Sequence, residues 1–145
     1  MNWQKISVER LREYTAQKDA ELSLAEQIET LELAFEAVRS ASFDATAVRG
    51  GGNKREDALI KNIVMRKELQ RNLEIVKREI ETTEKGLKAL SKEQRRILEK
   101  FFITRNYRHV EDLCEELCLE KSRIYTLKDE ALRKFTISCY GVVDL

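Results

Sequence analysis

Residues 113–125, LCEELCLEKSRIY, have the spacing of a helix-turn-helix motif. Such a motif needs apolar residues where its two helices touch, a small residue where they cross, and an exposed face on the second helix. Every position that the motif would bury, counted from Val110, is apolar or cysteine. These positions are Leu113, Cys114, Leu117, Leu119, Ile124 and Leu127. The pattern predicts helices at about 109–118 and 121–140, with Gly141 as the C-terminal stop.

Two of the three cysteines, Cys114 and Cys118, lie four positions apart here, and the single histidine, His109, lies one turn upstream. Zinc takes four ligands, commonly from C-x-x-C pairs, and the sequence places no fourth ligand nearby. We therefore interpret both cysteines as small space-filling residues and His109 as an ordinary helix-start residue. All three cysteines follow residue 113 and their odd number gives no disulfide framework, so we expect reduced thiols and neither a metal nor a cofactor.

The sequence SKEQ at 91–94 is a capping box, which starts a helix by pairing the Ser91 and Gln94 side chains with backbone N–H groups. We place a domain boundary there, between a helical arm at 1–90 and a small C-terminal domain at 91–145. A short helix follows the box, and the polar connector TRNYRH leads to the helix-turn-helix. The apolar residues of the short helix are Ile97, Leu98, Phe101 and Phe102.

Two long helices are expected in the arm, at about 7–39 and 54–88, with Ser7 as a plausible N-cap of the first. Their apolar residues alternate at spacings of four and three, which is typical of a coiled-coil seam. Residues 40–53 lose this period and end in a glycine run, so they are interpreted as a flexible connector. The seam residues are Leu24, Ile28, Leu31, Phe35 and Val38, followed by Leu69, Leu73, Val76, Ile80, Thr83, Leu87 and Leu90.

The predicted fold class is therefore all-α: a long antiparallel helical hairpin followed by a small C-terminal helix-turn-helix domain. The absence of proline leaves long stretches with nothing to break a helix. The same seam would serve equally well to pair two chains. Such seams are usually helix or dimer interfaces rather than ligand sites, so we also expect a homo-oligomer formed through the arm.

Composition narrows the function classes. No apolar run approaches the roughly 20 residues that a membrane span requires, so we expect a cytoplasmic protein with no membrane partner. The net charge of +1 excludes uniform coating of a polyanion but allows a local basic patch. The glycine run lacks a phosphate-cradle motif, and the single histidine has no nucleophile and carboxylate arranged around it. An enzyme is not expected.

The C-terminal third resembles a known family. LSKEQRRILEKFF, followed by VEDLCEELCLEKSRIYTLKDEALRKF, is similar to region 4 of the sigma-70 family. The layout of the whole chain resembles the sigma-like RinA and ArpU type of phage and prophage transcriptional activators. The chain departs from region 4 in a connector about two residues longer, in Cys118 where a turn glycine is common, and in Glu120 where serine or threonine commonly starts the second helix.

This resemblance implies a sequence-specific regulator that reads a double-stranded promoter element, with the arm used for oligomerisation or for contact with RNA polymerase. The start of a recognition helix reaches base edges in the major groove. The residues expected there are Lys121, Ser122, Arg123, Tyr125 and Thr126, and those expected at phosphates are Arg95, Arg96, Lys128 and Arg133. The alternative, favoured by the near-neutral charge of 91–145, is a helical protein interaction module whose helix-turn-helix does not bind DNA.

Overall fold

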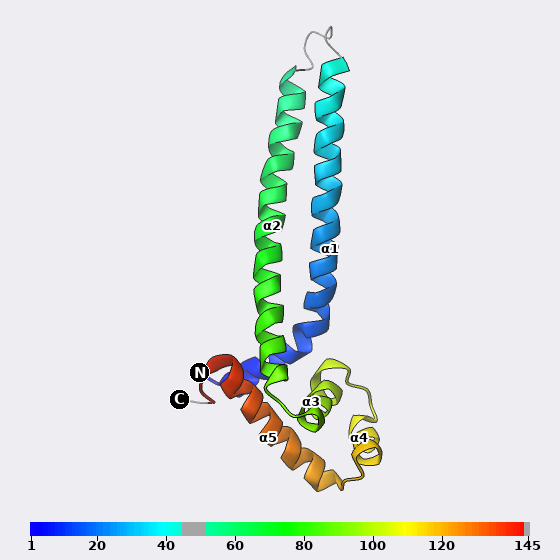
Figure 1. The fold of residues 1–145 in the computed structure, drawn as a ribbon, viewed down its shortest axis with the longest axis vertical. Coiled ribbons are helices and arrows are strands. Elements are labelled where there is room, and N and C mark those ends of the chain that lie inside the picture. Colours follow the sequence, from blue (N-terminus) through cyan, green and yellow to red (C-terminus); the bar gives the residue numbers. More distant parts are fainter. Residues whose placement is uncertain (45–51, 144–145) are drawn as a thin grey trace. The chain divides into compact units, whose positions relative to one another are not determined.

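The computed structural model describes residues 1–44 and 52–143, and within them the fold is all-α, as predicted (Figure 1). The helices are α1 (Trp3–Asp44), α2 (Gly52–Lys88), α3 (Lys92–Leu98), α4 (His109–Leu117) and α5 (Lys121–Tyr140), and α3 continues into a π-helical segment, η1 (Glu99–Ile103). Both long helices extend into the predicted connector 40–53. Residues 40–44 lack glycine and proline, so α1 meets no breaker there. Residues 45–51 of the connector lie outside the described part.

The first helix begins four residues earlier than predicted, because Asn2 rather than Ser7 provides the first cap. The Asn2 side-chain oxygen accepts a hydrogen bond from the Lys5 N–H at 3.0 Å. Ser7 instead lies inside α1 and is fully buried. Its hydroxyl accepts a hydrogen bond of 2.9 Å from the hydroxyl of Thr136 in α5. Ser7 therefore joins the two ends of the chain rather than starting a helix.

The chain divides into two compact units, each described here by itself. The hairpin unit comprises Lys18–Lys77, and the helix-turn-helix unit comprises Met1–Gln17 together with Arg78–Leu145. This division differs from the predicted boundary between residues 90 and 91. Residues at both ends of the predicted arm fall in the helix-turn-helix unit because their apolar side chains are buried there. The capping box at Ser91 marks the start of α3 but not the edge of a unit.

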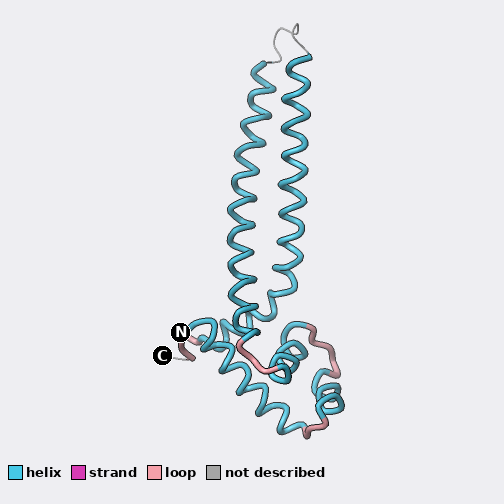
Figure 2. Tube along the Cα trace, viewed as in Figure 1, coloured by secondary structure: helices cyan, strands magenta, loops and turns pink. Residues whose placement is uncertain are grey.

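In the hairpin unit, α1 and α2 lie side by side and antiparallel within one chain (Figures 1 and 2). The Asn62 side chain of α2 donates a hydrogen bond of 2.8 Å to the backbone carbonyl of Leu31 in α1. The Arg66 guanidinium lies 4.8 Å from the centre of the Phe35 ring. Ile28 is buried and the other seam residues of this unit are half-buried. The predicted helical hairpin is confirmed.

The helix-turn-helix unit has two adjoining apolar clusters. The first joins four helices: Leu11 of α1, Leu87 and Leu90 near the end of α2, Leu98 of α3, and Ala131, Leu132 and Phe135 of α5. The second lies under the motif itself and contains Ile97, Phe101, Val110, Leu113 and Ile124. Around it pack Cys114, Leu117, Leu119 and Leu127, so every predicted buried position of the motif takes part. The N-terminal segment is therefore part of the support of α5.

The end of α5 approaches α2 very closely at Gly86. A Cβ atom at this position would lie 2.5 Å from the Cys139 sulfur and 2.6 Å from the Phe135 ring. Such distances are far below ordinary carbon contacts, so the glycine allows the two helices to touch. The Cys139 thiol donates a weak hydrogen bond of 3.6 Å to the Thr82 carbonyl, and burial raises its pKa. The burial and the higher pKa both favour the protonated thiol, and Cys139 is a free cysteine in the structure.

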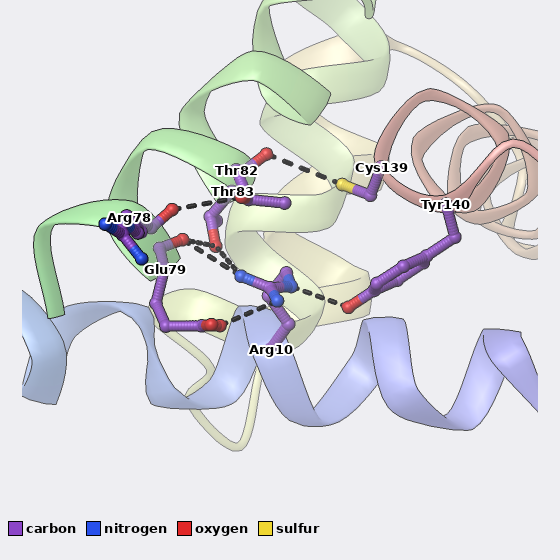
Figure 3. Close-up of polar contacts among 7 residues, drawn as sticks. All are labelled: Arg10, Arg78, Glu79, Thr82, Thr83, Cys139 and Tyr140. Carbon is purple, nitrogen blue, oxygen red and sulfur yellow. Dashed lines mark hydrogen bonds and ion pairs between the residues drawn. The ribbon is translucent and has the colours of Figure 1, made fainter. Parts of the chain in front are cut away.

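Arg10 of α1 joins the same two helices through polar contacts (Figure 3). Its guanidinium donates hydrogen bonds to the Tyr140 hydroxyl at 2.6 Å and to the Glu79 carbonyl at 2.9 Å. It also forms a 2.7 Å ion pair with the Glu79 carboxylate. Burial lowers the pKa of Arg10, but the contacts with Tyr140 and Glu79 outweigh that effect and raise the pKa above its ordinary value. Arg10 is therefore charged, and it holds α1, α2 and the end of α5 together.

Candidate nucleic-acid interface

The short helix that precedes the motif begins as predicted. The Ser91 hydroxyl accepts a 3.1 Å hydrogen bond from the Gln94 N–H, and the Gln94 side chain accepts one of 3.0 Å from the Ser91 N–H. This reciprocal pair is a complete capping box. It fixes where α3 starts, and α3 then places Ile97 under the motif.

The turn between α4 and α5 has a left-handed residue that is not glycine. Cys118 has φ 56° and ψ 43°, and it is the one non-glycine residue with positive φ in the described ranges. This conformation brings a Cβ atom close to the following carbonyl, at a cost of roughly 1–2 kcal/mol. The Leu119 N–H still reaches the Cys114 carbonyl, at 3.2 Å. Cys118 thus takes the place of the turn glycine, as predicted.

Helix α5 starts without a side-chain cap. Glu120 is extended, with φ −76° and ψ 155°, and its carboxylate makes no capping hydrogen bond. Backbone N–H groups in the first turn of a helix have no intrahelical acceptor, so here they rely on solvent or a ligand. Glu120, which stands where region 4 commonly has serine or threonine, therefore does not cap the helix. An anion at this end would meet the favourable end of the helix dipole.

All the residues predicted to contact bases are exposed. They belong to the first two turns of α5, in which Ile124 is buried, and they are Lys121, Ser122, Arg123, Tyr125 and Thr126. The Thr126 hydroxyl donates a 3.1 Å hydrogen bond to the Ser122 carbonyl. Its proton is therefore used within the helix, while its oxygen can still accept a hydrogen bond. The arrangement offers an ammonium, a guanidinium and a phenol on one helix end.

Phe101 of η1 joins this face to the start of α4. The Tyr125 ring meets Phe101 edge-on with 5.8 Å between ring centres, and the His109 ring also meets Phe101 edge-on, at 4.8 Å. The Lys128 ammonium lies 5.7 Å from the Phe101 centroid and 5.9 Å from the Tyr125 centroid. The exposed edge of Tyr125 is thereby held in place and not left to rotate freely.

Of the residues predicted to contact phosphate, two make strong contacts inside the chain. Arg95 donates two hydrogen bonds, of 3.3 and 3.2 Å, to the Leu87 carbonyl in the last turn of α2. Arg96 donates to both oxygens of the Glu116 carboxylate, at 2.9 and 3.1 Å, and the bond to Glu116 is the main reason that its pKa is raised. Arg95 thus closes a helix end, and a phosphate would compete with Glu116 for Arg96.

The two remaining predicted phosphate residues lie on α5. The Lys128 ammonium pairs with the neighbouring Asp129 carboxylate at 2.8 Å, and its side chain is mostly covered. Arg133 is exposed and carries no hydrogen bond or ion pair to another residue of the described ranges. Arg133 is therefore the most available of the four predicted phosphate contacts.

The sequence prediction left out three side chains of the connector between η1 and α4. Arg105, Tyr107 and Arg108 are all exposed, and they contribute two positive charges and a phenol close to Phe101 and His109. The polar connector TRNYRH contains the sequence signal, since it has two arginines and a tyrosine and no acidic residue. Their exposure and place depend on how the connector folds.

A family match covers most of the chain. Residues 37–136 match the model of a family described as protein of unknown function, DUF1492. The chain belongs to this family. No curated protein and no solved structure matches this chain significantly. In this DUF1492 protein the match includes α2 to α4 and every predicted base-contact residue, whereas the buried Leu11 lies outside it.

The described residues of this DUF1492 protein contain neither a metal-binding cluster nor a membrane-spanning helix. No group of three or more histidine, cysteine, aspartate or glutamate side chains there is placed to hold a metal ion. None of the helices in that part is long and apolar enough to cross a membrane. His109 itself lies 3.0 Å from the Asn106 carbonyl through Nδ1, at the first position of α4 as predicted.

Proposed function

We propose that this DUF1492 protein is a sequence-specific, sigma-like transcriptional regulator that binds a double-stranded promoter element and activates phage or prophage genes. The observation that carries the proposal is the exposed start of α5, where Lys121 to Thr126 present donors and acceptors behind a folded helix-turn-helix. The resemblance to region 4 supports the sigma-like role. The proposal places the protein in the cytoplasm and assigns it no catalytic activity.

Base recognition is tested with DNA selected from random sequence by the intact chain. Replacing Lys121 and Arg123 with alanine is expected to abolish the selected motif and to lower affinity for it at least about tenfold, since a good base contact contributes roughly 1–3 kcal/mol. Affinity is measured by fluorescence anisotropy on the selected duplex.

The matched control replaces one arginine and one lysine that are exposed outside α5, Arg12 of α1 and Lys77 of α2, with alanine. This variant has the same net charge but should keep the motif. If the intact chain enriches no duplex at low salt, or if both variants bind equally well, α5 is not a recognition helix.

The alternative function, a protein interaction module, draws support from the internal partners of Arg95, Arg96 and Lys128. These contacts reduce the positive charge that is free to meet a phosphate backbone. Residues 91–145 carry 11 basic and 10 acidic side chains, and this near-neutral balance also limits the positive electrostatic potential of the region. The selection experiment separates the two functions, because an interaction module would leave random DNA unenriched.

The proposal gives the hairpin unit the role of joining copies of the chain or of contacting RNA polymerase. Its support is a set of large apolar side chains that point away from the seam and are more than half exposed. On α1 these are Leu22 and Leu33, and on α2 they are Ile60, Val64, Met65 and Ile75. A helix that exposes this much apolar surface commonly binds a partner.

Association through α2 is tested by replacing Val64 and Ile75, which lie eleven residues apart and so share a helix face, with lysine. The intact chain is expected to sediment as a dimer and this variant as a monomer at the same micromolar concentration. The control carries lysine at the exposed polar positions Gln70 and Asn72 and should remain a dimer. An intact chain that sediments as a monomer would remove oligomerisation and leave polymerase contact as the proposed role.

A further inference from the structure

The connector between η1 and α4 has an ordered backbone that turns its largest side chains outward. The Asn106 side chain accepts a hydrogen bond of 2.9 Å from the Arg108 N–H, which is the geometry of an Asx turn. At one end the Thr104 N–H donates to the Glu99 carbonyl at 2.8 Å, and at the other the His109 ring contacts the Asn106 carbonyl. The side chains of this connector are therefore presented from a fixed support.

The exposed side chains of the connector have an unusual character for a link between two helices. Tyr107 is 92% exposed, the highest value among the large apolar and aromatic side chains of the described residues. Arg105 makes no hydrogen bond or ion pair within the described ranges. Arg108 has one weak ion pair, of 3.7 Å, with the exposed Glu115 carboxylate, and solvent and salt screen such a pair strongly. Residues 104–109 contain no carboxylate.

A relay of contacts links the connector to Tyr125 of α5. The Tyr125 ring contacts Phe101, the Phe101 ring contacts His109, and the His109 ring contacts the Asn106 carbonyl. Each of these steps is a direct contact, so the connector is separated from the recognition helix by the width of two rings. A duplex that lies on the N-terminal half of α5 therefore presents a sugar-phosphate strand near the connector.

We propose that Arg105, Tyr107 and Arg108 bind the phosphodiester backbone of the DNA on which α5 docks. The inference rests on the proposed function and adds a second contact surface to it. Guanidinium groups and a phenol hydroxyl are donors that suit phosphate oxygens, and such contacts fix the register of a protein on a duplex without reading its sequence. They would also supply positive charge for the DNA backbone, because Arg95, Arg96 and Lys128 already have partners inside the chain.

The chemistry of the connector favours a phosphate backbone over a protein surface. Residues that dominate protein interfaces lie in well-packed apolar pockets that exclude water. Tyr107 is instead isolated between two cationic side chains, and its immediate neighbours Asn106 and Arg108 are polar and exposed. An accessible phenol between arginines has the donors for an anionic strand but little apolar surface for a protein partner.

The test measures how salt weakens binding to the duplex that the intact chain selects from random DNA. Replacing Arg105 and Arg108 with glutamine is expected to lower the magnitude of the slope of log affinity against log salt by about 2, because each lost phosphate contact removes about 0.9. Affinity at low salt should fall about tenfold or more, with the selected motif unchanged. Tyr107→Ala should weaken binding by about fivefold, the equivalent of one neutral hydrogen bond.

The matched control replaces Arg12 of α1 and Lys77 of α2, which are both exposed, with glutamine, which gives the same change of net charge. Equal slopes for this control and the connector variant would overturn the inference, and so would loss of RNA polymerase binding by a connector variant with normal DNA binding. If the intact chain selects no duplex, the proposed function fails and the inference fails with it. If Lys121 and Arg123 prove essential while the connector variants match the control, the inference alone fails.

Discussion

Replacing Phe135 with alanine is expected to lower the free energy of unfolding by about 3–5 kcal/mol, the range typical of a fully buried phenylalanine. The ring is fully buried among Leu11, Leu87 and Leu98, which come from three different helices. Truncation would leave a cavity where these helices meet α5. The measurement is a urea titration monitored by circular dichroism at a fixed protein concentration. The variant should unfold at a lower midpoint urea concentration.

The control for this substitution lies two residues further along the same helix. Ile137 is 42% exposed, so Ile137→Ala removes a side chain from α5 without opening the core. Its expected cost is below about 1 kcal/mol, since surface substitutions usually change stability little. Similar midpoints for the two variants would contradict the described position of Phe135.

Leu11→Ala is expected to cost about 2–5 kcal/mol, although this residue lies more than 80 positions before the motif that it supports. Its side chain is fully buried in the cluster that includes Leu132 and Phe135. The same substitution should weaken binding to the selected duplex at temperatures where the unit is partly unfolded. Urea titration gives the stability change, and anisotropy at rising temperature gives the effect on binding.

The neighbouring exposed residue Arg12 offers the control, because Arg12→Ala alters α1 at nearly the same place without touching the core. The division predicted from sequence, with an arm at 1–90 separate from 91–145, makes a different forecast. If the arm were a separate domain, Leu11→Ala would leave the stability of the helix-turn-helix unchanged. A midpoint equal to that of Arg12→Ala would favour that division over the one described here.

The helix-turn-helix could be predicted from sequence because its rules are local. Leu113, Leu119 and Ile124 lie at fixed spacings within one motif, and each is buried or partly buried where the pattern requires. The capping box at Ser91 is also a contact between residues three positions apart. By contrast, the apolar residues of 1–17 do not show which helix they contact. The packing of Leu11 against α5 therefore could not be predicted from the sequence.

For the candidate site, the sequence predicts which residues of α5 are exposed, but it does not predict the contacts between side chains. Helical periodicity places Ser122 and Thr126 opposite Ile124, and their exposure follows from counting residues. The partners of Arg95 and Arg96 depend on which carbonyl or carboxylate the fold brings within reach, and sequence spacing does not determine them. The outward side chains of the connector depend on an Asx turn at Asn106, whose geometry a polar composition does not specify.

The helix-turn-helix unit is discontinuous in the chain, since Lys18–Lys77 is inserted between its two parts. The hydroxyls of Ser7 and Thr136, which touch in the folded unit, are separated by 129 positions in sequence. During synthesis the N-terminal segment therefore leaves the ribosome long before α5 exists. The inserted hairpin is fully synthesised before the rest of the helix-turn-helix unit. At about 5–20 residues per second the early segment waits several seconds for its partner. Closure of the unit is thus a late, long-range folding step, slower than is usual for a helical protein of this size.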